Sequence, residues 1–190
     1  VGVLDTNFTY SWSVTKDGEA FELSPFINTT SDEFTFDALD EGEWIATVVV
    51  TDKDSGSVTV ASTAITVTNV NPEAEFYAQS QNEEEGSLVY ASAVAGDAGW
   101  KDVLSYSWSV TKDGQPFEVP EDFVSNGDSL GFIAPDNGTY VLTLTVTDGD
   151  GGTTTIESDP IVVTNVAPNG SISGPTEGQE GSAITVQANP

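Results

Sequence analysis

The sequence contains no cysteine, no histidine and no methionine, and its basic side chains are limited to four lysines. Without cysteine the chain can form neither disulfide bonds nor zinc–thiolate sites. Without histidine and cysteine it also lacks the commonest general base and the thiol nucleophile of enzymes. We therefore expect that the chain is not an enzyme.

Acidic side chains dominate instead, because 31 aspartates and glutamates give a formal net charge of −27. Such a surface repels nucleic acids and anionic membrane surfaces, so we expect no nucleic-acid partner. No apolar run approaches the roughly 18 residues of a membrane span, so we expect no membrane insertion. The carboxylates fit two interpretations: a solvated face suited to salt water, and a set of ligands for cations. We expect both to hold.

Threonine and valine fill the less polar stretches, and their branching at Cβ favours strands over helices. Apolar residues alternate along the chain with a period of two, which is typical of half-buried strands. The inward positions of the clearest strands are Val89, Ala91, Ala93, Tyr106, Trp108, Val110, Leu130, Phe132, Tyr140, Leu142, Leu144 and Val146. Turn residues such as DGDGG at 148–152 separate these runs. The sequence predicts an all-β fold.

An internal repeat of about 96 residues organises the chain. The phrase YSWSVTKDG occurs at 10–18 and again, unchanged, at 106–114. The triplet EGS at 85–87 reappears at 180–182, which marks a third copy. We predict three segments: a repeat lacking its first two strands at 1–70, a complete repeat at 71–166, and the first two strands of a third repeat at 167–190.

Seven or so short strands per repeat indicate an immunoglobulin-like β-sandwich. In such folds a tyrosine before strand F bonds back to the backbone, and Tyr140 in DNGTY fits this corner. Trp44 occupies the same place in the first copy, so its indole N–H has to make the bond or the bond is lost. We expect Trp12 and Trp108 to fill the space between the sheets. Trp100 is the residue best suited to a specific external contact, or to packing between domains.

The combination YSWSV, DNGTY and LTVTDGDGG resembles the PKD-type (polycystic kidney disease) repeats found in tandem in large bacterial surface proteins. The first copy departs from the pattern at TDKDSG (51–56) and at Trp44. The resemblance implies tandem immunoglobulin-like sandwiches that act as spacer or adhesion modules, are often linked by calcium, and have no catalytic residues of their own.

The motif Asp-x-Asp-x-Gly at the turn between strands F and G is the one constellation that suggests chemistry. It comprises Asp52 and Asp54 in the first copy, and Asp148 and Asp150 in the second. Carboxylates two residues apart in a tight turn can converge on a hard cation such as calcium. The alternative is structural, because aspartate and glycine are favoured in any hairpin turn.

Sandwich geometry brings further oxygen ligands to the same place. The F–G and B–C loops share the pole where the chain enters, beside the preceding linker and the exit pole of the first copy. This crowd of carboxylates repels itself unless a divalent ion is bound, so we predict calcium at the domain junction. The predicted ligands are Asp52, Asp54, Asp97, Asp102, Asp148, Asp150, Asn71, Glu73, Asp40 and Glu41.

These features predict a non-catalytic structural repeat of an extracellular or cell-surface rod, filament or adhesin stalk. Short proline-containing linkers at 68–72 and 164–168 favour end-to-end stacking. The alternative is a carbohydrate- or protein-binding module appended to a secreted enzyme. The expected partners are neighbouring repeats or identical subunits, with a glycan or cell-surface ligand as a further option. Segments 167–190 and 1–70 are complementary, which fits a continuous array or strand donation between subunits; we favour the continuous array.

Overall fold

The computed structural model describes residues 7–99, 102–119, 124–125 and 127–190. Strands and irregular segments make up this part of the chain, and it contains no helix. The described residues therefore contain no helix that could cross a membrane. The chain divides into two compact units. Unit 1 comprises Val1–Glu75, Val94–Ser107 and Thr145–Thr155, and unit 2 comprises Phe76–Ala93, Trp108–Leu144 and Ile156–Pro190.

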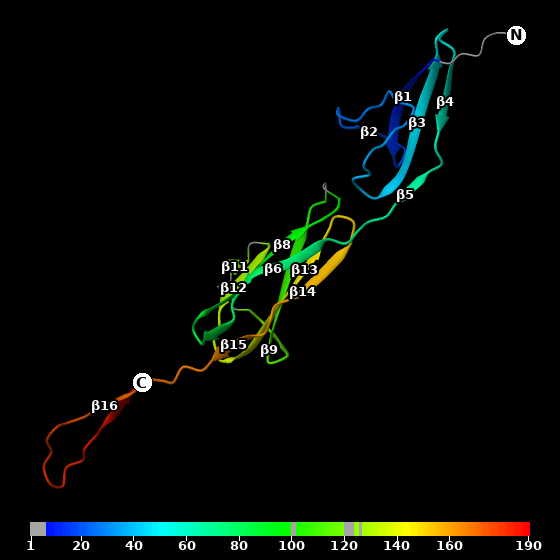
Figure 1. Ribbon diagram of the computed structural model, residues 1–190. Coiled ribbons are helices and arrows are strands. Elements are labelled where there is room, and N and C mark those ends of the chain that lie inside the picture. Colours follow the sequence, from blue (N-terminus) through cyan, green and yellow to red (C-terminus); the bar gives the residue numbers. More distant parts are fainter. Residues whose placement is uncertain (1–6, 100–101, 120–123, 126) are drawn as a thin grey trace. The chain divides into compact units, whose positions relative to one another are not determined.

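The first repeat forms a single antiparallel sheet, coloured blue to teal in Figure 1. Its strand order is β2-β1-β3-β4, and β5 also pairs with β3. The long central pair β1–β3 runs in register from Phe8 opposite Asp52 to Lys16 opposite Trp44. The bounds are β1 Phe8–Lys16, β2 Glu19–Phe21, β3 Gly42–Asp52, β4 Ser57–Ala61 and β5 Ile65–Val67.

The second repeat forms two sheets, which confirms the predicted sandwich architecture. One has the order β10-β9-β13-β15-β7, with β14 also paired to β13, and the other has the order β11-β12-β8-β6. The first contains β7 Asn82–Glu84, β9 Ser105–Lys112, β10 Gln115–Phe117, β13 Gly138–Thr147, β14 Thr153–Glu157 and β15 Ile161–Thr164. The second contains β6 Glu73–Gln79, β8 Leu88–Gly96, β11 Val124–Ser125 and β12 Ser129–Ile133.

The hydrophobic core lies in unit 2 and takes residues from both of these sheets. Leu142 on β13 and Val89 on β8 are fully buried, as the alternating pattern predicts. Trp108 is half-buried and packs against this core beside Phe76, with ring centroids 5.9 Å apart. Its indole N–H donates to the carbonyl of Gly127 at 2.8 Å. Trp108 therefore packs against the core as a half-buried side chain, whereas Trp100 lies outside the described residues.

The corner before strand β13 is built as the sequence predicts. The hydroxyl of Tyr140, which is fully buried, donates to the carbonyl of Asp136 at 2.9 Å. In the first repeat the indole N–H of Trp44 donates to the carbonyl of Asp40 at 3.3 Å. The bond is thus retained in the first repeat, with a longer distance and a different donor.

Removing the corner hydroxyl should destabilise the sandwich while leaving its packing intact. We expect Tyr140→Phe to lower the free energy of unfolding by about 0.5–1.5 kcal/mol, the usual contribution of one hydrogen bond. Urea denaturation followed by circular dichroism measures the change. Tyr77→Phe is the matched control, because the Tyr77 side chain is 66% exposed. Equal loss of stability in both variants would contradict the structural role of the corner.

The last two strands form a separate antiparallel hairpin. These are β16 Ser171–Ser173 and β17 Gln187–Asn189, with Ile172 opposite Ala188. They lie within residues 167–190, the segment in which the sequence predicts the first two strands of a third repeat. In the third repeat, therefore, these strands pair with each other.

Candidate cation site

Aspartates cap the turn between β13 and β14. One carboxylate oxygen of Asp148 accepts hydrogen bonds from the backbone N–H groups of Asp150 (3.0 Å) and Gly152 (2.7 Å). Its other oxygen accepts from the side-chain amide of Asn69 at 2.9 Å. A Cβ on Gly152 would lie 2.3 Å from that oxygen, so a larger residue there would displace the Asp148 carboxylate. The hydrogen bond from Asn69 is the main reason that the pKa of Asp148 is lowered, against the effect of burial.

The equivalent turn of the first repeat has the same internal bonds and different surroundings. Asp52 accepts from the backbone N–H groups of Asp54 (2.9 Å) and Gly56 (2.7 Å). The side chain of Asp54 forms an ion pair with Lys53. Neither aspartate belongs to a group of converging carboxylates among the described residues. The first aspartate of each motif therefore has the structural role of a turn cap.

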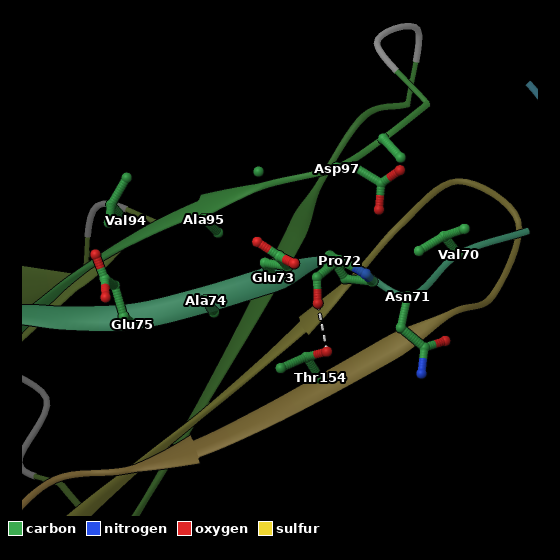
Figure 2. A pocket seen from close by; sticks show the side chains of 12 residues that line it. Val70, Asn71, Pro72, Glu73, Ala74, Glu75, Val94, Ala95, Asp97 and Thr154 are labelled. Atoms are coloured by element: carbon green, nitrogen blue, oxygen red, sulfur yellow. Dashed lines mark hydrogen bonds between the residues drawn. The ribbon is translucent and has the colours of Figure 1, made fainter. Parts of the chain in front are cut away.

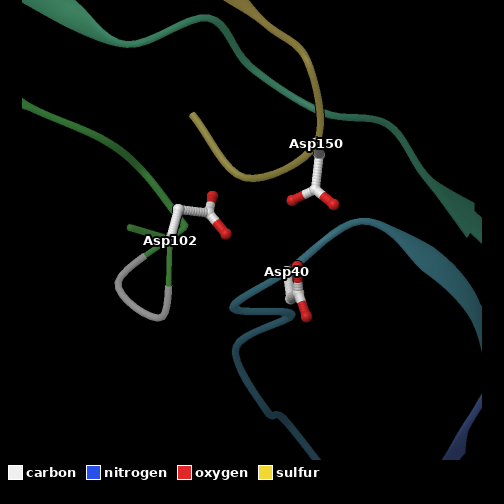
Figure 3. A group of neighbouring side chains, drawn as sticks. All are labelled: Asp40, Asp102 and Asp150. Carbon is white, nitrogen blue, oxygen red and sulfur yellow. The ribbon is translucent and has the colours of Figure 1, made fainter. Parts of the chain in front are cut away.

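Three aspartates of unit 1 converge, and Figure 3 shows their carboxylates pointing toward one another. Asp40 precedes β3, Asp102 precedes β9, and Asp150 lies in the β13–β14 turn. Each offers a carboxylate oxygen, and these three oxygens lie within 4.8 Å of one another. We call this group the aspartate cluster. The sequence predicted all three as ligands from their loops, and the structure brings them together.

The charges of the aspartate cluster act on one another. The pKa of Asp102 is raised, first by desolvation and then by the neighbouring charges of Asp150, Asp97 and Asp40. Glu41 lies at the edge of the group, and its pKa is raised chiefly by a hydrogen bond with Asp40. The fold therefore holds carboxyl groups close together at some electrostatic cost.

Lys16 partly compensates this negative charge and was missed by the sequence reasoning. Its ammonium group lies 2.8 Å from an Asp40 carboxylate oxygen, and this hydrogen bond lowers the pKa of Asp40. A signal was present, because Lys112 stands at the same repeat position and pairs with Asp136, the counterpart of Asp40. The repeat itself could therefore have identified this ion pair.

Three predicted ligands remain, and they line an open pocket of about 920 Å³ near the start of β6 and the end of β8 (Figure 2). They are Asn71, Glu73 and Asp97. One oxygen of Asp97 accepts from the backbone N–H of Gly99 at 2.7 Å. The other is buried and has no hydrogen-bond partner. Buried polar atoms are normally satisfied, so this oxygen retains the capacity to bind a donor or a cation.

The aspartate cluster and its neighbours offer oxygen ligands only. Hard cations such as calcium prefer carboxylate, carbonyl and amide oxygens, whereas zinc and copper sites in proteins usually include nitrogen or sulfur. The donor set therefore fits calcium. Asp40, Asp102 and Asp150 would form its centre, with Glu41 beside them.

The central part of the chain matches a known family. Residues 83–164 match the family described as K319L-like, PKD domain. No curated protein sequence matches the chain. The family match covers the segment that contains most of the sandwich.

Several solved structures are similar to the chain at a low level. Fibronectin(III)-like modules of Clostridium thermocellum CbhA are 15% identical over 86% of this chain and 83% of theirs, with a TM-score of 0.38. The titin domains z1z2, solved in complex with telethonin, are 17% identical over 84% and 83%, with a TM-score of 0.41. Protocadherin gammaB7 EC3-6 is 18% identical over 95% and 48%, with a TM-score of 0.38. These scores support no inference about function. The match of residues 83–164 to a PKD domain confirms the PKD-type resemblance of this part of the chain.

Proposed function

We propose that the chain is a non-catalytic structural repeat of an extracellular rod, fibre or adhesin stalk, and that calcium at the aspartate cluster rigidifies it. The observation that carries the proposal is the convergence of Asp40, Asp102 and Asp150 from three separate loops. A cation held by all three would tie the loop before β3 to the two loops of the following repeat. Successive repeats would then stack end to end with little freedom.

The absence of catalysis is part of this proposal. The converging carboxylates are accompanied by a lysine that is paired with Asp40, and the sequence contains no histidine or cysteine to serve as base or nucleophile. Because Asp148 uses both carboxylate oxygens in hydrogen bonds, it serves the turn. These features favour a structural role for the site.

Calcium titration tests the proposal directly. After chelation, calorimetric titration of the chain with calcium should show binding, and the melting temperature should rise with calcium concentration. Magnesium at the same concentration should give a smaller shift, because it demands a tighter octahedral geometry. Absence of heat and of any melting shift at millimolar calcium would overturn the calcium part of the proposal.

A further inference from the structure

Lys16, the last residue of β1, brings a positive charge to the aspartate cluster. Its ammonium nitrogen lies 2.8 Å from a carboxylate oxygen of Asp40 and 3.4 Å from one of Asp17. The side chains of Lys16 and Asp40 are 23% and 22% exposed, so water screens this pair less than a fully exposed one. One of the three cluster carboxylates is therefore already in contact with a cation that the chain itself supplies.

The surrounding backbone provides the position of this ammonium group. A Cβ on Gly42 would lie 3.0 Å from Cε of Lys16, so the glycine leaves the room that the lysine side chain uses. Gly42 also has a φ of +132°, which residues with a side chain rarely adopt. Asp17 is held in turn, because it accepts a hydrogen bond from the backbone N–H of Glu43 at 2.8 Å. Lys16 therefore reaches Asp40 through a seat that is part of the fold.

The complete repeat contains the same lysine–aspartate contact without a carboxylate cluster. Lys112 lies 2.6 Å from Asp136, and its Cε lies 2.6 Å from where a Cβ on Gly138 would be. Asp136 belongs to no group of converging carboxylates among the described residues. The contact is thus a property of the repeat, and the presence of Asp102 and Asp150 beside Asp40 distinguishes the first copy.

The cluster retains a capacity for further positive charge. Asp97 and Asp102 both lie beside Gly99, where an added Cβ would contact carboxylate oxygens of both. One oxygen of Asp97 is buried and has no hydrogen-bond partner in the described part of the chain, and buried oxygens normally have a donor or a cation. The carboxylates therefore carry more negative charge than Lys16 alone compensates, so a divalent ion is still attracted to them.

We propose that Lys16 is a tethered cation that competes with calcium for Asp40 and thereby lowers the calcium affinity of the aspartate cluster. In the calcium-free chain, its ammonium group offsets part of the repulsion among the carboxylates and stabilises the loops that carry them. When calcium binds, the ammonium group opposes it, because both positive charges share one carboxylate. The inference rests on the proposed calcium site and deepens it by naming the residue that determines its affinity.

Calorimetric titration of Lys16→Met with calcium tests this competition, because methionine keeps much of the apolar stem and removes the charge. We expect the calcium dissociation constant to fall roughly tenfold, the size of a charge interaction across a few ångströms at a protein surface. Lys16→Arg keeps the charge and should bind calcium as the original chain does. Lys112→Met is the matched control, since it removes the same charge from the equivalent pair, which contacts Asp136. Its calcium affinity should stay within about twofold of the original.

The charge of the ion separates competition from a role in positioning Asp40. Terbium(III) binds the same kind of oxygen ligands as calcium and carries one more positive charge. If Lys16 acts through its charge, the gain in Lys16→Met should grow from roughly tenfold for calcium to roughly thirtyfold for terbium. A lysine that only positioned Asp40 would give the opposite result, with weaker binding of both ions by a similar factor.

Thermal melts in chelator test the calcium-free half of the inference. Lys16→Met should melt about 2–4 °C below Lys112→Met, because only the first variant leaves the clustered carboxylates without this ammonium group. Equal melting temperatures, or unchanged or weaker calcium binding in Lys16→Met, would overturn the inference and leave the proposed calcium site standing. If the original chain fails to bind calcium and Lys16→Met binds it, the proposed function fails and the inference holds. If neither binds calcium, both fail.

Discussion

Replacement of Trp108 by alanine is expected to lower the free energy of unfolding by about 3–5 kcal/mol, the range for removal of a large aromatic side chain from a packed interior. The indole packs against the sandwich core and beside Phe76. Its N–H also bonds to the Gly127 carbonyl, which would be left without this donor. Urea denaturation followed by circular dichroism measures the loss.

Trp108→Phe separates the two contributions to that loss. Phenylalanine keeps most of the apolar packing and removes the indole N–H. The loss in unfolding free energy for Trp108→Phe should therefore be less than half of the loss for Trp108→Ala. A recognition role for Trp108 makes the opposite prediction, in which alanine leaves stability unchanged and abolishes binding of an external ligand. Unchanged stability in Trp108→Ala would therefore refute its assignment to the core.

Asp102→Asn is expected to change stability in opposite directions with and without calcium. The pKa of Asp102 is raised in the folded chain. A carboxyl group whose pKa is higher in the folded than in the unfolded chain stabilises the folded state at pH values below its unfolded pKa. This stabilisation is lost as pH rises through the folded pKa. At pH 7 the ionised group therefore opposes folding, so asparagine should raise the melting temperature of the calcium-free chain.

With calcium present the same substitution removes one ligand charge. A ligand at 100 times its dissociation constant stabilises the folded state by about 2.7 kcal/mol, and Asp102→Asn should forfeit most of this gain because its calcium affinity falls. Thermal melts at pH 7 in chelator and in calcium measure both effects. Glu157→Gln is the control, since it removes one charge from an exposed position on β14. The same response in both variants would mean that net charge, and not the aspartate cluster, governs the effect.

Much of the fold follows from alternation and turn chemistry in the sequence. Tyr140, Leu142, Leu144 and Val146 alternate along β13 and are fully buried, as a period of two requires. Residues 34–37 show the limit of such reasoning. Phe34 and Phe36 alternate as Leu130 and Phe132 do, yet a strand needs a hydrogen-bonded neighbour, and pairing depends on tertiary context that a local pattern does not contain.

The sequence predicted the three members of the aspartate cluster, but it also predicted ligands that lie outside the cluster. Loop positions in a sandwich indicated Asp40, Asp102 and Asp150. The motif alone could not distinguish Asp150, which joins the cluster, from Asp54, which pairs with Lys53. Asp150 and Asp54 differ because different residues lie beside their two turns in the folded chain. The repeat pattern is the same for both turns, so it contains no information about these neighbours.

The placement of the lysines limits how the chain can be digested. Proteases that cleave after basic residues have four target bonds in 190 residues. Two of them follow Lys16 and Lys112, the last residues of β1 and β9, which lie opposite Trp44 and Gln115 in the sheets. Because a protease needs an exposed, flexible segment, cleavage at these bonds requires local unfolding of the sheet. Digestion with a trypsin-like enzyme should therefore spare these two bonds at first and cut after Lys53, which lies in the exposed turn between β3 and β4.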